Sequence, residues 1–188
     1  MTDFTFHTEG SAPEASKPLV AGAKRSLGFL PNLLAGMAAA PALLEGYMNL
    51  ASIFDKSDLT ETERQIILMT NNRLNGCTYC MAAHTSIAQA AKVPADVIEA
   101  LRKGTAIADP KLEALRQFSI AVNKQRGWVD QGDLDQLFAA GYTQQTVLEV
   151  ILGTSLKVMS NYTNHVANTP VDAAFKANAW SADDSHAA

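Results

Sequence analysis

Two cysteines and one histidine stand close together as Cys77-x-x-Cys80-x-x-x-His84, and they include both cysteines of the 188-residue chain. On a helix that begins at Cys77, offsets of three and seven residues place all three side chains on one face. The N-terminus of a helix favours a thiolate, and a C-x-x-C pair there commonly has one thiol of lowered pKa. His84, one turn beyond Cys80, can accept the thiol proton. The cluster therefore predicts thiol-redox chemistry, in which a thiolate attacks an oxidant and an intramolecular disulfide forms.

Two other interpretations of the cluster stay open. A structural staple is not indicated, because a disulfide between residues three apart restricts the unfolded chain little, but the cysteines could be small buried residues beside a packed histidine. A zinc site could take Cys77, Cys80, His84 and the distant His165 as four ligands. The sequence has one C-x-x-C and no second close ligand pair. We therefore favour redox chemistry and expect no metal.

The elements around the cluster are predicted to be helices. No segment combines β-branched and aromatic residues in strict alternation, whereas helix start and stop signals recur along the chain. Thr60 and Glu63 have the spacing of a capping box, and Asp109, Asp130 and Thr143 are candidate N-caps. We therefore predict an all-α fold with helices over residues 13–25, 41–54, 61–74, 77–92, 95–103, 110–124, 131–139 and 143–167.

Two segments of the sequence share a pattern. Residues 60–84 and 143–165 each run from a capping threonine through apolar residues to a polar motif that ends in histidine. This pattern fits a duplicated helical hairpin, and it fits helix periodicity alone equally well. No low-complexity linker divides the chain, so we expect one domain over residues 1–180 and a disordered tail over residues 181–188.

Composition and charge exclude several classes of protein. Lysine and arginine total 15 against 19 aspartates and glutamates, which gives a formal net charge of -4, and no stretch gathers the bases into a stripe that could neutralise phosphates. The apolar stretch over residues 27–43 is interrupted by glycine, proline and asparagine and is too broken to span a bilayer. The N-terminus lacks a secretory signal. We therefore expect a soluble, cytoplasmic protein that binds neither nucleic acid nor membranes.

The segment around the cluster resembles a known protein family. Residues 63–84 read E-R-Q-I-I-L-M-T-N-N-R-L-N-G-C-T-Y-C-M-A-A-H, which is similar to the core of the AhpD-like alkylhydroperoxidases within the carboxymuconolactone decarboxylase superfamily. The likeness continues through Thr85-x-x-Ala88. Two later motifs resemble the peroxidase-related branch of that superfamily, namely Asn161-Tyr162-x-Asn164-His165 and Thr169-Pro170-Val171-Asp172.

The resemblance implies a fold, an activity and residue roles. It implies an AhpD-like helical bundle that forms homo-oligomers, often trimers or hexamers, and that reduces hydroperoxides without a cofactor, using electrons from an external dithiol. In this scheme Cys80 attacks the peroxide after activation by His84, and Cys77 forms the disulfide. The helix dipole alone would favour Cys77 as the reactive thiol. The role of Cys80 therefore rests on the resemblance and on its spacing from His84.

One position departs from the family pattern. The family's proton-relay glutamate lies twelve residues before the first cysteine, and this chain has Gln65 there. Gln65 lies ~15 Å along its helix from the turn, at about 1.5 Å per residue. In an antiparallel hairpin the same length along the next helix ends near His84, so the two side chains can meet. Glutamine can hydrogen-bond the imidazole but cannot accept its proton, so we expect weaker activity or another relay. Glu63 points about 200° away around the helix, and we assign it to the capping box.

Three other side chains are candidates for lining the site, namely Tyr79 within the C-x-x-C and Asn161 and His165 near the end of the last helix. Tyr79 could equally be a packed aromatic residue, and the other two a polar cluster at a helix end. Two functions other than a thiol-dependent peroxidase are compatible with the sequence. A carboxymuconolactone decarboxylase-like proton-transfer enzyme does not depend on a C-x-x-C, which argues against it. A non-enzymatic redox sensor stays in consideration because of Gln65.

Overall fold

The computed structural model describes residues 3–181 of the chain, and these residues form helices without any β-strand. The predicted all-α fold is confirmed. Two short 3₁₀ helices, η1 (Glu14–Ser16) and η2 (Ala173–Asn178), flank the α-helices near the two ends of the described chain. The α-helices are α1 (Lys17–Leu27), α2 (Asn32–Met37), α3 (Pro41–Phe54), α4 (Glu61–Leu74), α5 (Thr78–Ala90), α6 (Ala95–Lys103), α7 (Pro110–Lys124), α8 (Gln131–Ala139) and α9 (Gln144–Ala167).

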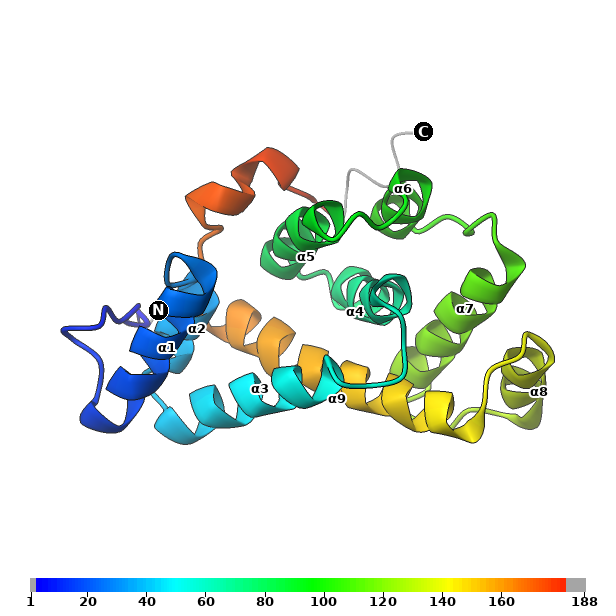
Figure 1. The fold of residues 1–188 in the computed structure, drawn as a ribbon, viewed down its shortest axis with the longest axis horizontal. Coiled ribbons are helices and arrows are strands. Elements are labelled where there is room, and N and C mark those ends of the chain that lie inside the picture. The colour runs from blue at the N-terminus through cyan, green and yellow to red at the C-terminus, as the bar shows by residue number, and fades with distance from the viewer. Residues whose placement is uncertain (1–2, 182–188) are drawn as a thin grey trace.

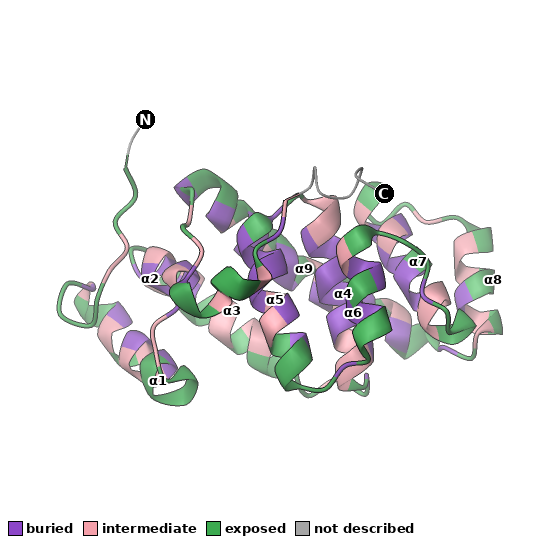
Figure 2. Ribbon diagram, turned by 90° about the horizontal axis from the view of Figure 1, so that it is seen from above, coloured by how far each residue is buried: buried purple, intermediate pink, exposed green. Residues whose placement is uncertain are grey.

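Helix α4 lies at the centre of the molecule, surrounded by α5, α6, α7 and α9 (Figure 1). Ile66, Ile67 and Met69 are fully buried on different sides of this helix. A helix that is enclosed on all sides must carry apolar side chains around most of its circumference, and the Ile-Ile-Leu-Met run does so. In Figure 2, α4 is buried along most of its length, and much of α5 is buried as well. Helix α4 is therefore the central element of the core.

The predicted caps account for where the helices begin. Thr60 and Glu63 form a reciprocal capping box at the start of α4, Asp130 does the same for α8 with Asp133, and Asp109 caps α7. Each cap satisfies backbone N–H groups that the first helical turn leaves without partners. The bounds of α1, α5 and α9 differ by one to four residues from the predicted ranges 13–25, 77–92 and 143–167, and α2 is not among the predicted helices. The first segment starts as the 3₁₀ helix η1 before α1, and Cys77 is the N-cap of α5 rather than its first helical residue.

The link between α4 and α5 is a tight turn that reverses the chain. Gly76 has φ of +65°, a left-handed conformation that favours glycine, and Cys77 N donates to Asn72 O at 2.9 Å to close the turn. The second half of the proposed repeat has no such turn, because α9 runs without interruption through 24 residues. The duplicated hairpin is therefore wrong for residues 143–165. Gly153 stays helical there and lets α9 approach Ile67 and Phe54 closely.

A second cluster of buried residues joins the N-terminal helices α1, α2 and α3 to the start of α5. Both cysteines belong to it, together with Tyr79. Helix η2 returns along α5 on the side away from α4, as Figure 1 shows. The cysteine pair is thus enclosed between the N-terminal helices, α5 and the C-terminal part of the described chain.

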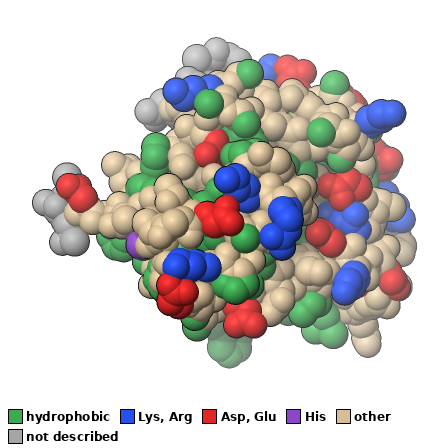
Figure 3. Space-filling view, turned by 60° about the vertical axis from the view of Figure 1, so that its left-hand side comes forward, with side chains coloured by type: hydrophobic (Ala, Val, Ile, Leu, Met, Phe, Trp, Pro, Cys, Tyr) green, Lys and Arg blue, Asp and Glu red, His purple; other side chains and the backbone are tan. Residues whose placement is uncertain are grey.

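On the face shown in Figure 3, acidic and basic side chains are interspersed. None of the helices within residues 3–181 is long and apolar enough to cross a membrane. Apart from Ser181, the tail predicted to be disordered lies outside the described residues.

Candidate active site around Cys80

The two cysteines are free thiols at the start of α5, and both are buried. A single amide group contacts both of them, because Asn164 Nδ2 of α9 donates to Cys80 Sγ at 3.1 Å and lies 3.6 Å from Cys77 Sγ. The predicted proximity of the pair is confirmed. A disulfide between the two sulfurs can form without a large movement of the backbone.

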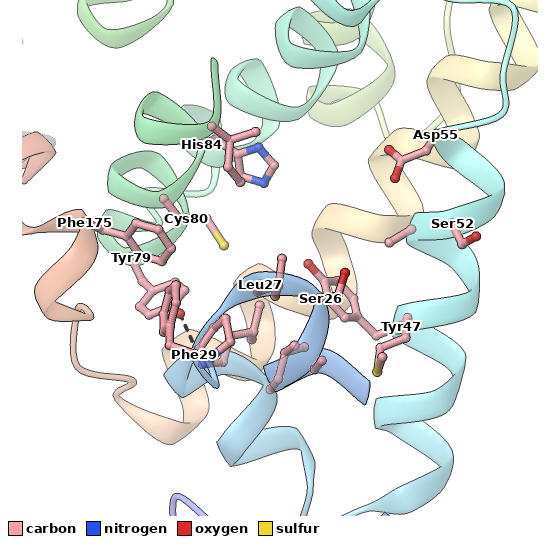
Figure 4. A pocket seen from close by; sticks show the side chains of 18 of the residues that line it. Ser26, Leu27, Phe29, Tyr47, Ser52, Asp55, Tyr79, Cys80, His84 and Phe175 are labelled. Carbon is pink, nitrogen blue, oxygen red and sulfur yellow. Dashed lines mark hydrogen bonds between the residues drawn. The ribbon is translucent and has the colours of Figure 1, made fainter. Parts of the chain in front are cut away.

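The two cysteines differ in access to a cavity of about 540 Å³. Cys80 and His84 both line this cavity, whereas Cys77 does not. Figure 4 shows the sulfur of Cys80 pointing into the open space, with the imidazole of His84 beside it. Exposed residues at the rim, such as Leu27 and Ser52, connect the cavity to solvent. A small molecule that enters the cavity therefore meets Cys80 before Cys77.

The wall of the cavity is largely apolar and includes a group of aromatic rings. Phe175 packs edge-on against Phe29 and Tyr79, with ring centroids 5.8 and 6.2 Å apart. The hydroxyl of Tyr79 donates to Asp172 Oδ2 at 2.6 Å, and the amide of Leu33 donates to the same hydroxyl at 3.3 Å. Tyr79 thus lines the cavity with its ring and ties α2, α5 and the C-terminal segment together with its hydroxyl. Both roles considered for Tyr79 are present.

The surroundings of the two thiols drive their acidities apart. Burial opposes ionisation of Cys80, but the hydrogen bond from Cys77 and the positive charge of Lys157 outweigh it and lower the pKa of Cys80. Hydrogen bonds from Ser160 and Asn161 act in the same direction. The hydrogen bond to Cys80, together with burial, raises the pKa of Cys77. The arrangement favours a thiolate on Cys80 and a neutral thiol on Cys77.

His84 is held at both ring nitrogens. Nδ1 lies 2.9 Å from Oε1 of Gln65, and Nε2 lies 3.0 Å from Nζ of Lys157. The predicted contact between Gln65 and His84 is therefore present. Burial, and next the charge of Lys157, lower the pKa of His84 well below its usual value. The imidazole is therefore neutral near pH 7.

The carboxylate of Glu61 determines the direction of the hydrogen bonds that link Gln65, His84 and Lys157. Gln65 Nε2 donates to Glu61 Oε1 at 2.8 Å, because a carboxylate can only accept. The carbonyl oxygen of Gln65 must then face His84 and accept from Nδ1–H. Nε2 of the neutral imidazole is left as an acceptor for the amine of Lys157. Both ring nitrogens of His84 are therefore occupied.

A network of asparagines supports the cysteine-bearing turn from behind. Asn72 Nδ2 donates to the backbone oxygen of Cys80 at 3.2 Å, and Asn161 Nδ2 donates to Asn72 Oδ1 at 3.0 Å. Asn75 Nδ2 in turn donates to Asn161 Oδ1 at 2.9 Å. Asn161, predicted as a candidate, is fully buried here and holds α4, α5 and α9 in register.

His165 does not fit the predicted place at the site. Its side chain is exposed on the outer side of α9 and stacks on Tyr162, with ring centroids 6.5 Å apart. The four zinc ligands considered above are therefore not brought together. Within residues 3–181, no group of three or more histidine, cysteine, aspartate or glutamate side chains forms a potential metal site. Glu63 keeps its structural role, since its carboxylate accepts from Thr60 and from the hydroxyl of Tyr142.

Sequence reasoning missed three residues of α9 that contact the site, namely Lys157, Ser160 and Asn164. Together with Asn161 they have spacings of three, four and seven residues, which place them on one face of a helix. All four are buried, and Lys157 has no exposed surface at all. One signal in the sequence could have indicated these residues. A lysine and three small polar residues share one face of a helix whose other residues are largely apolar.

Comparison with known proteins shows the same helical arrangement in several solved structures. A peroxidase-related protein with an alkylhydroperoxidase AhpD core from Ralstonia eutropha JMP134 has a TM-score of 0.80 at 19% identity, over 93% of this chain and 96% of that chain. A peroxidase-related protein from Silicibacter sp. TM1040 gives 0.79 at 18%, over 93% and 92%. The debrominase Bmp8 in complex with 2,3,4-tribromopyrrole, with a cysteine replaced by alanine, gives 0.78 at 22%, over 95% and 96%.

Residues 38–121 match the carboxymuconolactone decarboxylase family. The resemblance found in the sequence is thereby confirmed, and the fold is AhpD-like. No curated protein matches the chain.

The carboxymuconolactone decarboxylase segment contains only part of the site. Cys77, Cys80, His84 and Gln65 lie inside it, whereas Lys157 and the asparagines of α9 lie outside. The cysteine pair thus lies within the family segment. Its electrostatic surroundings come largely from α9.

Proposed function

We propose that the chain is a thiol-dependent peroxidase that reduces hydroperoxides through Cys80 and Cys77. The observation that carries this proposal is the difference between the two thiols. Cys80 opens onto the cavity and is favoured as a thiolate, and Cys77 lies behind it as a neutral thiol. Such a pair has one sulfur for attack and one for resolution.

The reaction proceeds in two steps that balance. The Cys80 thiolate attacks the outer oxygen of a hydroperoxide, the O–O bond breaks, and a sulfenic acid and an alkoxide are formed. The alkoxide takes up one proton and leaves as the alcohol. The Cys77 sulfur then attacks the sulfenic sulfur, and the Cys77 proton leaves with the hydroxyl group as water. An external dithiol, itself oxidised to its disulfide, restores both cysteines.

The decisive experiment titrates thiols in the purified protein before and after one equivalent of an organic hydroperoxide. We expect rapid loss of two thiols per chain and an intramolecular disulfide between Cys77 and Cys80, with one equivalent of alcohol released. The Cys80→Ser variant serves as the control and should consume no peroxide. Retention of both thiols in the folded wild type would contradict the proposal and favour proton-transfer chemistry.

A second candidate is reductive removal of bromide from an aromatic ring. It is supported by the aromatic wall of Phe29, Tyr79 and Phe175 beside Cys80, and by the fold shared with the debrominase Bmp8. The two thiols would supply two electrons and one proton, so that an aryl bromide becomes the arene and bromide while a disulfide forms. Bromide release from polybrominated pyrroles such as 2,3,4-tribromopyrrole, without consumption of hydroperoxide, would favour this candidate over the first.

A further inference from the structure

Lys157 is a buried amine without a carboxylate partner among the described residues. Its side chain has no exposed surface, yet it lines the same cavity as Cys80. The ion pairs of the described chain involve other lysines and arginines. A buried ammonium is costly unless an opposite charge or hydrogen bonds compensate it. His84 supplies one hydrogen bond, at 3.0 Å, but no negative charge.

The groups around Lys157 leave one suitable counter-charge. From α3, Tyr47 keeps its proton because burial raises its pKa. Asp55 is exposed at the rim, and the positive charge that acts on its carboxyl is that of Arg64. From α4, Gln65 is neutral, and it separates the carboxylate of Glu61 from His84. From α5, His84 is neutral and Cys80 can ionise.

We propose that Lys157 is the catalytic cation of this site, holding Cys80 as the thiolate and giving a proton to the leaving alkoxide, while His84 positions the lysine amine. Because both nitrogens of His84 are occupied, by Gln65 and Lys157, the imidazole has no free position for the thiol proton. His84 is thus a positioning residue. The role of Lys157 as proton donor rests on the proposed peroxidase function, whereas its role in stabilising the Cys80 thiolate does not.

The proton balance closes with the lysine included. Attack of the Cys80 thiolate on ROOH forms the sulfenic acid and RO⁻, and Lys157 gives one proton, so that ROH leaves and a neutral amine stays. Cys77 then forms the disulfide and releases water with its own proton. An external dithiol that reduces the disulfide gives up two protons. One proton goes to the Cys77 thiol, and Cys80 returns as the thiolate. The other proton restores the ammonium of Lys157.

The first role can be tested without any peroxide. The rate at which iodoacetamide alkylates Cys80 is measured from pH 4 to 9, with Cys80 identified by peptide mass spectrometry. In Lys157→Met, which keeps the length of the side chain without its charge, we expect the apparent pKa of Cys80 to rise by about one to three units. In Lys157→Arg much of the wild-type profile should return. His84→Asn retains the cation and should shift the profile less than Lys157→Met does.

The outcome that overturns the proposal is a folded Lys157→Met protein with the wild-type profile, or a larger shift in His84→Asn than in Lys157→Met. If Lys157→Met does not fold, nitrogen-15 NMR of the wild-type imidazole decides. His84 should stay neutral, with the proton on Nδ1, while thiolate absorbance at 240 nm is present. An imidazolium that titrates together with the thiolate would instead make His84 the counter-ion.

The second role is tested with two oxidants in single-turnover reactions. A peroxyacid expels a carboxylate, which leaves readily without a proton, whereas an alkyl hydroperoxide expels a strongly basic alkoxide. After correction for the thiolate fraction, Lys157→Met should slow the alkyl hydroperoxide by about 10²- to 10⁴-fold, the usual range for general acid catalysis, and the peroxyacid much less. Equal effects on both would overturn the proton-donor role. Wild-type protein that reacts with neither oxidant would contradict the peroxidase function, and the alkylation profile would still test the thiolate role.

Discussion

Oε1 of Gln65 lies 2.9 Å from Nδ1 of His84, at the position where the family resemblance implies a glutamate. The amide accepts a hydrogen bond from the imidazole on one side and donates a hydrogen bond to Glu61 on the other. A hydrogen bond is thus preserved at this place, but a basic group next to the imidazole is not.

Gln65→Glu is expected to increase the reactivity of the cysteine pair towards hydroperoxide near neutral pH. A carboxylate at this position strengthens the hydrogen bond from Nδ1–H of His84 and makes Nε2 a better acceptor for the Lys157 ammonium, which favours the cation that stabilises the Cys80 thiolate. The new carboxylate would also face Glu61, so the gain should be larger in the double variant Gln65→Glu/Glu61→Gln, which restores a donor to a carboxylate across that contact. The rate of thiol loss as a function of pH, compared among wild type and the two variants, measures the effect. Identical profiles in folded proteins would place Gln65 outside the proton pathway.

The two cysteines should respond differently to replacement by serine. Cys80→Ser removes the thiol that faces the cavity and is expected to abolish peroxide consumption. Cys77→Ser should still permit one oxidation and then stop, with Cys80 trapped as a sulfenic acid. Labelling with dimedone and intact-mass measurement distinguish the two. The roles are reversed if dimedone labels Cys77 in Cys80→Ser while Cys77→Ser stays unreactive.

Tyr79→Phe tests whether the tyrosine acts through its ring or its hydroxyl. The change removes the 2.6 Å hydrogen bond to Asp172 and leaves the ring against Phe175. A buried hydrogen bond to a charged group typically contributes about 1.5–3 kcal/mol, so we expect a loss of this order in the free energy of unfolding by urea. The rate of Cys80 alkylation at pH 7 should change little. A large fall in that rate with unchanged stability would instead assign the hydroxyl to the chemistry.

Gly153→Ala should destabilise the fold where α9 crosses the helix core. A Cβ at this position would lie 2.8 Å from Ile67 Cγ2 and 2.8 Å from Phe54 Cζ. Overpacking of this kind typically costs about 1–3 kcal/mol of unfolding free energy. Gly46→Ala on the exposed side of α3 is the matched control, because its nearest contact is an ordinary 3.7 Å from Met159 Cε. An equal midpoint of urea unfolding for both variants would contradict the prediction.

The chain is expected to form homo-oligomers, and the surface of α9 indicates how. Exposed apolar side chains on this helix follow spacings of three, four and seven residues, the pattern of a seam between helices: Leu148, Ile151, Val158, Tyr162 and Val166. Sedimentation at micromolar concentration should show a trimer or hexamer rather than the 20.1 kDa chain. Ile151→Glu should shift it towards the monomer, whereas Ile53→Glu on α3 should not. A wild-type monomer under these conditions would remove the prediction.

Residues 41–54 of the sequence carry more large apolar side chains than one stripe against a small core requires, which also predicts an interface between copies of the chain. In the structure these residues form α3, and Tyr47, Met48 and Ala51 form one wall of the cavity. Those side chains therefore line the cavity within a single chain and need no partner chain to cover them. The sequence did not predict the seam on α9, because the same helix also carries buried residues at similar spacings.

The sequence alone determined most of the local structure. Helices α3, α4, α6, α7 and α8 begin and end at the predicted residues, because caps, prolines and glycines act within a few positions along the chain. The C-x-x-C-x-x-x-H spacing likewise placed the thiols and the imidazole on one helix, and the length of helix to the turn brought Gln65 to His84.

Only the tertiary structure decided which residues of α9 face the thiols. Neighbouring positions on a helix differ by about 100° in direction, so Asn164 contacts both sulfurs whereas His165 points to solvent. That rotation is set by how α9 packs against α3 and α4, which depends on Gly153 and on contacts between residues far apart in the chain. The same packing buries Lys157 against His84, 73 positions away, and no local pattern contains that contact.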